Sequence, residues 1–581
     1  MNPNSSIVKH VSSAKLKSIR LRFARLYGGE MADCMLERFY HMVGRYGVGI
    51  ETSSPKSLWD ERDASLITYA DMVRGEGESP LQTLCRFCSE NLKGSFSTIH
   101  LLPFFPWSSD EGFSVIDYRE VSSEYGDWQD VSRFAGEFDL MFDLVLNHCS
   151  SRSEWFLDYV AGIEPAGNYF QEADPESDLS AVVRPRASPL LTPTATRSGQ
   201  RHVWTTFSAD QVDLNWRSPD LLFEFLDFVM LYLSKGCRIL RLDAVAFLWK
   251  EIGTNCLHLS ECHEVVKLLR DFLEVVAPDV ILLTETNVPH EENVSYFGHG
   301  DEAHLVYQFS LPPLLLHGLL EGTPVHLSQW AMDLAPPPPG CSFLNFTASH
   351  DGIGVRPLEG ILPQVQIDEL AKKIQERGGH VSMRSLEDGK ESPYELNTTF
   401  FEALSCDDSE LSKARFLCSQ AVAFAMRGIP AVYFHSLTAS PNWKEGFEQT
   451  GEKRSVNRKK WKVDELDGLL GDGDSVTSRV FDWLARLLRR RSSCPAFHPD
   501  ADQVILDLGD SVFALERVSL DQAQTILCFF NFTPSPASIP RAGRLAEVFS
   551  GGKARDLVGG GEVVIPSEGI VLRPYQALWL V

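Results

Sequence analysis

The sequence predicts an α/β protein whose main unit is a barrel of parallel strands. Short apolar runs recur along the chain and are separated by segments long enough to hold helices, which is typical of a parallel sheet. Several runs end in polar or acidic residues, as in barrels whose strand ends carry chemistry. From about residue 500, apolar runs instead alternate with Gly and Pro turns. We therefore expect a (β/α)8 TIM barrel with inserted loop domains and a C-terminal antiparallel β domain.

The length of 581 residues fits one large barrel, its insertions and a small appended domain. Apolar runs of strand length define the expected barrel strands. These are 66–70, 99–105, 140–146, 239–242, 280–285, 306–309, 343–346 and 431–434. Residues 1–60 show apolar positions at helical spacing, which favours an added helical layer docked on the barrel.

Two polar segments interrupt the alternation of strands and helices. Residues 150–205 are rich in Pro, Ser, Asp and Arg, and residues 355–405 form a second irregular insertion. Long excursions of this kind within a compact fold are usually functional loops or small inserted domains. The predicted organisation is therefore barrel over 61–149, 206–354 and 406–499, insertions between these parts, and the β domain over 500–581.

Composition limits the possible partners and the compartment. The formal charge of -25 argues against non-specific nucleic-acid binding and against a basic membrane-surface role. Runs of apolar residues are too short to span a membrane, and the basic N-terminus is not followed by the apolar segment of a secretion signal. The twelve cysteines are mostly scattered, which favours a reducing compartment. We expect a cytoplasmic protein with neither nucleic-acid nor membrane partners.

The strand ending at Asp243 carries the first chemical signal. Arg241 and Asp243 are charged residues at the end of an apolar run and lie on the same face of the strand. For this pair alone, a structural ion pair at a strand end is favoured over catalysis. If Asp243 is a nucleophile, Arg241 would lower its pKa and keep it ionised.

Two further carboxylates close other predicted strands. Glu285 follows an apolar run and Asp351 follows the strand over 343–346. Three acids at one barrel face favour catalysis, because glycoside cleavage requires two carboxylates of different pKa. Partial burial could raise the pKa of Glu285 towards that of a general acid. His350, next to Asp351, offers a donor for sugar hydroxyls.

The motifs around these acids resemble a known family. Residues 143–148, 241–245 and 349–351, together with Glu285, are similar to the α-amylase-type enzymes of glycoside hydrolase family 13. Five further runs narrow the resemblance to its sucrose phosphorylase branch: 100–105, 110–113, 250–254, 311–317 and 350–355. The N-terminal segment, residues 392–397 and residues 454–461 most resemble those of glucosylglycerate phosphorylases.

The resemblance implies roles for matching residues. Asp243 would be the nucleophile, Glu285 the acid/base and Asp351 the transition-state stabiliser. The residues that would hold the glucosyl unit are Asp110, Phe113, His148, Arg241, His350 and Arg454. The implied reaction is double displacement with retention, in which inorganic phosphate receives glucose as α-glucose 1-phosphate. A small-molecule sugar and phosphate would be the partners; no cofactor or metal is implied, and no residue pattern indicates an oligomeric state.

Phosphate needs positive charge in a site lined by acids. Arg184 and Arg186 lie in the first insertion, and Arg186 resembles the arginine that the family uses for phosphate. Arg197 and Arg201, by contrast, are expected to tie the loop to acidic neighbours.

The remaining candidates concern the acceptor. Phe247 stands where sucrose phosphorylases carry Tyr, and Glu395 where they carry Gln. Arg356 or Arg186 could bind the carboxylate of glycerate. The expected function is thus transfer of glucose between 2-O-α-glucosylglycerate and phosphate. Glucosylglycerol, sucrose 6-phosphate or sucrose phosphorylase activity, and a hydrolase or transglucosylase of the same clan, are the alternatives.

Overall fold

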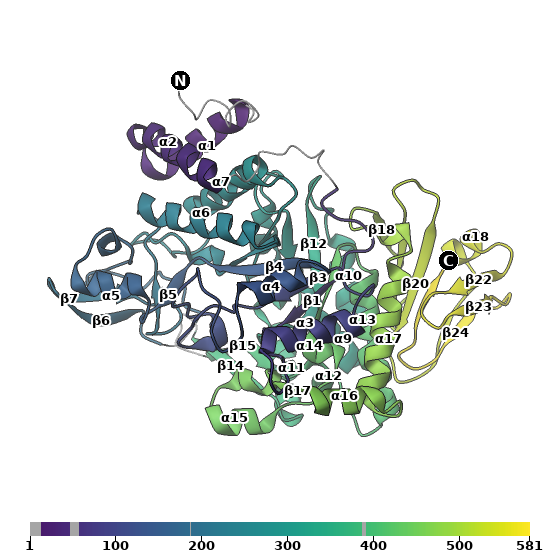
Figure 1. The fold of residues 1–581 in the computed structure, drawn as a ribbon. Coiled ribbons are helices and arrows are strands. Elements are labelled where there is room, and N and C mark those ends of the chain that lie inside the picture. The colour runs from purple at the N-terminus through teal and green to yellow at the C-terminus, as the bar shows by residue number, and fades with distance from the viewer. Residues whose placement is uncertain (1–12, 47–56, 186–187, 386–390) are drawn as a thin grey trace.

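The computed structural model describes residues 13–46, 57–185, 188–385 and 391–581. Its centre is a closed barrel of parallel strands (Figure 1). In barrel order the strands are β1 (Ser65–Thr68), β3 (Thr98–Leu101), β4 (Asp139–Val145), β9 (Cys237–Asp243), β10 (Ile281–Thr284), β11 (Leu305–Tyr307), β12 (Ser342–Phe346) and β16 (Ile429–Tyr433). Every strand predicted from an apolar run is present, and the predicted (β/α)8 barrel is confirmed.

The register of the barrel brings charged residues of different strands together. Asp143 of β4 is the register partner of Arg241 on β9, and Val145 is the partner of Asp243. On the other side of β9, Leu283 of β10 pairs with Arg241. Because all strands are parallel, their carboxyl ends open on one face of the barrel, where β9, β10 and β12 deliver their acids.

Helices cover the outside of the barrel. The longer ones are α3 (Pro80–Asn91), α4 (Trp128–Phe134), α6 (Pro219–Ser234), α7 (Ser260–Val276), α9 (Leu311–Glu321), α10 (Val325–Asp333), α13 (Ser409–Ala425), α16 (Val463–Gly471) and α17 (Val476–Arg491). Shorter elements are β2 (Val73–Arg74), α8 (His290–Val294), α12 (Phe400–Ala403), α14 (Phe434–Leu437), α15 (Lys444–Thr450) and β17 (Trp461–Lys462). Ser218 caps α6 by accepting from the Leu221 amide, and Pro219 occupies its first turn, a combination that favours helix initiation.

The N-terminal helices α1 (Ser13–Tyr27) and α2 (Gly29–Tyr46) lie against α7 and α6 (Figure 1). Apolar residues such as Phe23 and Phe39 are buried, and Phe39 packs on Phe272 of α7. Arg22 forms an ion pair of 3.1 Å with Glu264 and one of 3.4 Å with Asp271. This layer covers the outer helices, away from the strand ends that carry the acids.

The insertions provide loops around those strand ends. The first contains β5 (His148–Ser150), α5 (Glu154–Ala161), β6 (Leu191–Thr196), β7 (Gly199–Trp204) and β8 (Gln211–Asp213). The second contains β13 (Ile353–Gly354), α11 (Gln364–Glu376), β14 (His380–Ser385) and β15 (Glu391–Asn397). The expectation that 355–405 is irregular is therefore wrong. Ile367, Leu370 and Ile374 form a buried helical face there, and the strands join in the order β13-β15-β14.

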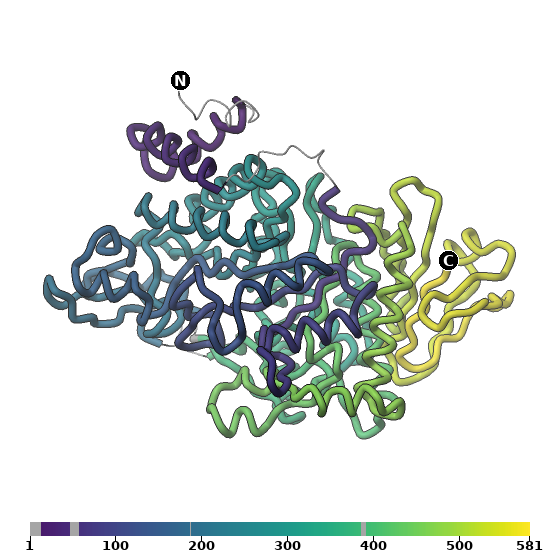
Figure 2. Tube along the Cα trace, viewed as in Figure 1, coloured from purple at the N-terminus to yellow at the C-terminus, as the bar shows by residue number. Residues whose placement is uncertain are grey.

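The C-terminal region is an antiparallel β unit, as predicted. Its larger sheet has the order β18 (Asp502–Ile505), β19 (Val512–Val518), β20 (Thr525–Asn531), β25 (Ala577–Leu580), β22 (Lys553–Asp556) and β23 (Gly561–Val564). A second sheet pairs β21 (Ala537–Ile539) with β24 (Ile570–Leu572), and α18 (Gly543–Val548) lies between. Figure 2 shows this yellow region at the opposite side of the molecule from the first insertion. Within the described ranges, each helix is too short or too polar to cross a membrane.

Candidate active site

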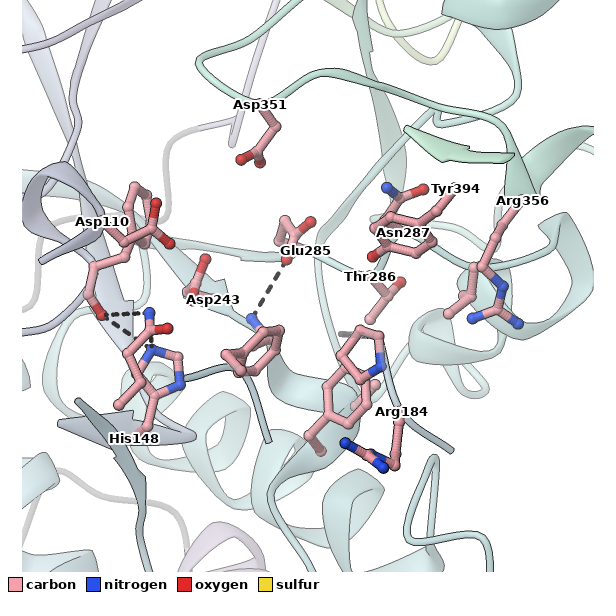
Figure 3. Close-up of a pocket in the computed structure, with 18 of the residues that line it drawn as sticks. Asp110, His148, Arg184, Asp243, Glu285, Thr286, Asn287, Asp351, Arg356 and Tyr394 are labelled. Atoms are coloured by element: carbon pink, nitrogen blue, oxygen red, sulfur yellow. Dashed lines mark hydrogen bonds between the residues drawn. The ribbon is translucent and has the colours of Figure 1, made fainter. Parts of the chain in front are cut away.

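The three predicted carboxylates line one cavity at the carboxyl end of the barrel. Asp243 is the last residue of β9, Glu285 follows β10, and Asp351 lies in the loop between β12 and β13. Figure 3 shows them surrounding a common space from different elements. The strand ends thus bring together acids that are far apart in sequence, which glycoside chemistry requires.

Asp243 is held by a buried chain of charges that begins inside the barrel. Arg241 donates through Nη1 to Oδ1 of Asp243 at 2.9 Å, and the same nitrogen contacts Asp143. On the far side of Asp143, Nε2 of His100 lies 2.7 Å from its Oδ2. This chain fixes the orientation of the Asp243 carboxylate. His100 and Asp143 belong to the quoted motifs, but their spacing alone did not indicate this role.

The expected effect of Arg241 on Asp243 requires a correction. Arg241 does act to lower the pKa of Asp243, but burial raises that pKa well above its usual range, and Glu285 adds to the rise. The reason is visible in the contacts, since Arg241 divides its charge between Asp243 and Asp143. Asp243 is also only 8% exposed. Arg241 therefore offsets part of the cost of ionising Asp243 rather than all of it.

Glu285 stands in an environment suited to a proton donor. Burial raises its pKa, Arg241 opposes this, and nearby Asp351 raises it further. The Ala244 amide lies 3.4 Å from Oε2 of Glu285 (Figure 3). Ala244 itself has a left-handed backbone with φ of 52°, so the chain turns sharply after Asp243. The direction of the pKa shift of Glu285 agrees with the prediction.

These shifts lead to an expected pH profile. Because Asp243 and Glu285 interact, their titrations belong to the pair, and the active form carries one proton between them. A raised pKa keeps Glu285 protonated above the ordinary carboxyl range, so the rate is lost only as pH rises through that raised value. The rate also falls as pH drops through the pKa of Asp243, which burial raises well above the ordinary carboxyl range, so the acidic limb lies at a higher pH than for an exposed Asp. We expect a bell-shaped profile of kcat/KM for the glucoside.

The assignment is tested with α-glucosyl fluoride, whose leaving group needs no proton. With this donor, Glu285→Gln should keep the acidic limb of the profile and lose the alkaline limb. An alkaline limb that persists unchanged in Glu285→Gln would assign it to another group.

One end of the cavity carries charged and aromatic groups fit to hold a sugar. Arg454 forms a 2.6 Å ion pair with Asp351 and lies 3.9 Å from Asp110. The ring of Phe113 stacks on that of His350 with centroids 4.7 Å apart. Nε2 of His148 lies 2.9 Å from the Phe113 carbonyl oxygen. All of these residues line the cavity with the three acids.

Arg458 is a member of this group that the sequence prediction missed. It is buried, it donates to the His350 carbonyl oxygen at 2.9 Å, and its guanidinium lies 3.6 Å from Asp110. Nearby arginines, together with burial, hold the pKa of His350 well below its usual range. His350 is therefore a neutral ring beside a cluster of charges. The proximity of Arg454 within the same short run is the signal that could have identified Arg458.

Glu395 occupies a different place from the acceptor position expected for it. It is 1% exposed and lies behind Arg454, to which it forms two parallel hydrogen bonds of 3.0 and 3.1 Å. It also accepts from the Gly352 amide. A buried carboxylate paired in this way supports the guanidinium geometry. Glu395 thus positions Arg454 against Asp351 and does not form part of the cavity wall.

The other end of the cavity is lined by the predicted Arg184, Phe247 and Arg356. Arg186 lies outside the described residues. The cavity wall also contains residues that were not predicted, namely Phe207, Gln211, Asn287, Arg384 and Tyr394. Asn287 follows Glu285 by two residues, and this position in the chain could have indicated that it lines the cavity. Arg201 lies 3.7 Å from Glu172, which fits its expected ion-pairing role.

A buried lysine next to this site contacts the side-chain oxygens of two polar residues. Nζ of Lys250 lies 2.7 Å from Oδ2 of Asp213 and donates to Oδ1 of Asn147 at 2.6 Å. The Lys250 side chain is 2% exposed. Its ammonium therefore supplies the positive charge that these oxygens require. Asp174 and Asp178, two acids of the first insertion, accept hydrogen bonds from backbone amides of their own loop.

The fold and the acids at its strand ends define an α-amylase-type barrel enzyme. Residues 93–323 match the model of the alpha amylase catalytic domain. The chain is 42% identical to the glucosylglycerate phosphorylase of Escherichia coli, covering 96% of this chain and 98% of that protein. It is 44% identical to the glucosylglycerate phosphorylase of Allomeiothermus silvanus, covering 97% and 98%. The chain therefore belongs to the α-amylase family, in its branch of glucoside phosphorylases.

A solved structure supports the same placement. The crystal structure of sucrose 6F-phosphate phosphorylase from Thermoanaerobacter thermosaccharolyticum superimposes with a TM-score of 0.71 at 26% identity. The match covers 81% of this chain and 94% of that chain.

Proposed function

We propose that the protein is a retaining phosphorylase that reversibly transfers glucose from 2-O-α-glucosylglycerate to phosphate. The proposal rests on the observation that Asp243, Glu285 and Asp351 line the same cavity as Arg184 and Arg356. The carboxylates suit glycosyl transfer, while the arginines suit anionic partners. The relatives named glucosylglycerate phosphorylases, which match nearly the whole chain, support the same substrate.

In the first step, Asp243 attacks the anomeric carbon of the glucosyl unit. The bond from that carbon to the glycerate oxygen breaks, and Glu285 gives its proton to the departing oxygen. The product is a glucosyl ester on Asp243 together with free glycerate. Positive charge that develops on the sugar ring is stabilised by Asp351, whose carboxylate is oriented by the ion pair with Arg454.

In the second step, a phosphate oxygen attacks the same carbon and the ester bond to Asp243 breaks. Two inversions restore the α configuration and give α-glucose 1-phosphate. The attacking phosphate oxygen carries a proton, which passes to Glu285 as the bond to the sugar forms and restores the acid for another cycle. Water competes with phosphate at this step, so the site must favour an anion.

The cavity residues divide into groups with different tasks. Asp110, Phe113, His148, His350 and Arg454 hold the glucosyl unit, and Arg241 aligns the nucleophile. On the acceptor side, Arg184 and Arg356 provide positive charge, and Phe247 provides an apolar wall whose ring packs edge-on against Phe207 at 5.4 Å. The family resemblance adds Arg186 as a phosphate ligand.

The acceptor is tested by the release of phosphate from α-glucose 1-phosphate. We expect glycerate to give a higher kcat/KM than glycerol, fructose or fructose 6-phosphate, because the arginines favour a carboxylate over a neutral acceptor. Free glucose should accumulate slowly without acceptor. Faster phosphate release with glycerol or fructose 6-phosphate would contradict glycerate as the substrate. Free glucose as the main product in phosphate buffer would instead indicate a hydrolase.

We also propose that the protein works in the cytoplasm. Its twelve cysteines are unpaired, and most of them are buried in apolar surroundings, as expected of structural thiols in a reducing compartment. The sugar phosphate product fits the same location, since a charged ester is retained inside cells.

A further inference from the structure

Arg384 lines the acceptor side of the cavity and has no role in the function proposed so far. It lies on β14, in the second insertion, while Arg356 follows β13 in the same small sheet. Between them Glu359 accepts from Nη2 of Arg384 at 2.5 Å, and its same oxygen lies 3.8 Å from Nε of Arg356. One glutamate therefore serves two arginines.

The charges of this group do not balance. Among the contacts of the described residues, two guanidiniums and one carboxylate leave a surplus of one positive charge. The arginine side chains are 13% and 21% exposed, so water screens the surplus only in part. Nε of each arginine is buried and has no hydrogen-bond partner among the described residues. Burial lowers the pKa of Arg384, Glu359 opposes this, and the neighbouring Arg356 lowers the pKa further, so an additional anion at this place would stabilise the cation.

Polar side chains lie between Arg356 and Glu285. Asn287 and Tyr394 lie between Glu285 and Arg356 in the cavity (Figure 3). Oδ1 of Asn287 is also buried and without a partner among the described residues. Gly354 makes room for this side chain, because a Cβ at 354 would lie 2.3 Å from Oδ1 of Asn287. Asn287 thus offers an acceptor for a hydroxyl between Glu285 and the cation of Arg356.

We propose that Arg356 and Arg384, aligned by Glu359, form a clamp for the carboxylate of the glycerate acceptor. This inference rests on the proposed function and specifies its selectivity. Glycerate has matching groups on either side of the carbon whose oxygen Glu285 protonates: a hydroxyl that can donate to Asn287, and a carboxylate that carries one negative charge. The single positive surplus of the clamp matches that carboxylate. Glycerol would offer no second anion, so the two guanidiniums would share only the carboxylate of Glu359.

Phosphate has a separate source of positive charge. Arg184 belongs to the first insertion and Arg356 to the second, and Figure 3 shows the two side chains apart at the same end of the cavity. Glu359 also discourages a dianion at the clamp, because it is a fixed negative charge beside both arginines. The clamp therefore selects the acceptor, whereas attack by phosphate depends on Arg184.

The test compares Arg384→Gln, Arg384→Lys and the wild type. We expect Arg384→Gln to lower kcat/KM for glycerate by about 10- to 100-fold, the effect of losing one charge-assisted contact, with kcat/KM for glycerol nearly unchanged. Arg384→Lys should recover only part of the loss, since it keeps the charge but not the planar fork. Lys372→Gln is the matched control, because it removes an exposed positive charge from the same insertion.

A second assay separates the clamp from phosphate binding. Arsenate attack on the glucosyl enzyme formed from α-glucose 1-phosphate needs no glycerate and should change less than 3-fold in Arg384→Gln, roughly the size of an indirect effect. Equal losses with glycerate, glycerol and arsenate would overturn the clamp and assign Arg384 to phosphate or to structure. Wild-type protein that does not use glycerate at all would refute the proposed function, whatever Arg384 does.

Discussion

Asp243→Asn is expected to lower the rate of glucosylglycerate phosphorolysis by at least about 10⁴-fold, as for other enzymes that lose a covalent nucleophile. An amide cannot form the glucosyl ester, and it also removes the negative charge that faces the developing oxocarbenium ion. Binding of the substrate should survive, because the glucosyl pocket is built from other residues. The measurement is the production of α-glucose 1-phosphate from glucosylglycerate and phosphate.

The fold should tolerate this substitution. Asn has the shape of Asp, and its side-chain oxygen can still accept from Arg241, which also keeps its contact with Asp143. Asp220→Asn, which alters an exposed carboxylate on α6 paired with Arg38, is the matched control and should retain wild-type activity. Circular dichroism and melting temperature should be nearly unchanged in both variants. Phosphorolysis by Asp243→Asn at near wild-type rates would exclude Asp243 as the nucleophile.

Glu285→Gln is expected to lower the same rate by about 10²- to 10⁴-fold, the usual contribution of general acid catalysis. The loss should depend on the leaving group. Glycerate departs as a poor leaving group and needs the proton of Glu285, whereas fluoride departs without one. With α-glucosyl fluoride as donor and phosphate as acceptor, Glu285→Gln should therefore keep much of the wild-type rate of formation of α-glucose 1-phosphate.

This contrast distinguishes proton transfer from a general disturbance of the site. Asp243→Asn should be inactive with both donors, because both need the nucleophile. If Glu285→Gln is equally impaired with glucosylglycerate and α-glucosyl fluoride, the role of Glu285 is not that of an acid. Glu292→Gln, on the short helix α8 that follows, provides a control for the loss of one carboxylate near the same strand.

Much of the barrel could be predicted because its strands are short, continuous apolar runs. β9 and β12, for example, are buried along most of their length, and a short continuous apolar run is typical of such a buried parallel strand. The acids Asp243, Glu285 and Asp351 were found for the same reason, since charge at the end of a buried strand is unusual. The second insertion was predicted, but its regular structure was missed because its helix and hairpin are amphipathic elements within a polar segment.

The parts of the site that could not be predicted depend on contacts between distant segments. Glu395 lies behind Arg454 because β15 pairs with β13 across a loop that composition does not reveal. Arg384 reaches the cavity because β14 pairs with β15 in the same sheet. The pKa of Asp243 was predicted with the wrong net direction, since sequence showed Arg241 but neither the burial of Asp243 nor the carboxylates of Glu285 and Asp143 beside it. Local spacing identifies neighbours along a strand, whereas these effects arise across strands.

The central claim is that glucose passes through a covalent ester on Asp243. It is tested most directly by mixing Glu285→Gln with α-glucosyl fluoride in the absence of phosphate, quenching with acid and mapping peptides by mass spectrometry. We predict one added anhydroglucose unit on the peptide that contains Asp243, and its disappearance as α-glucose 1-phosphate when phosphate is added before the quench. Product formation with an adduct on another residue, or with inverted configuration at the anomeric carbon, would contradict the mechanism.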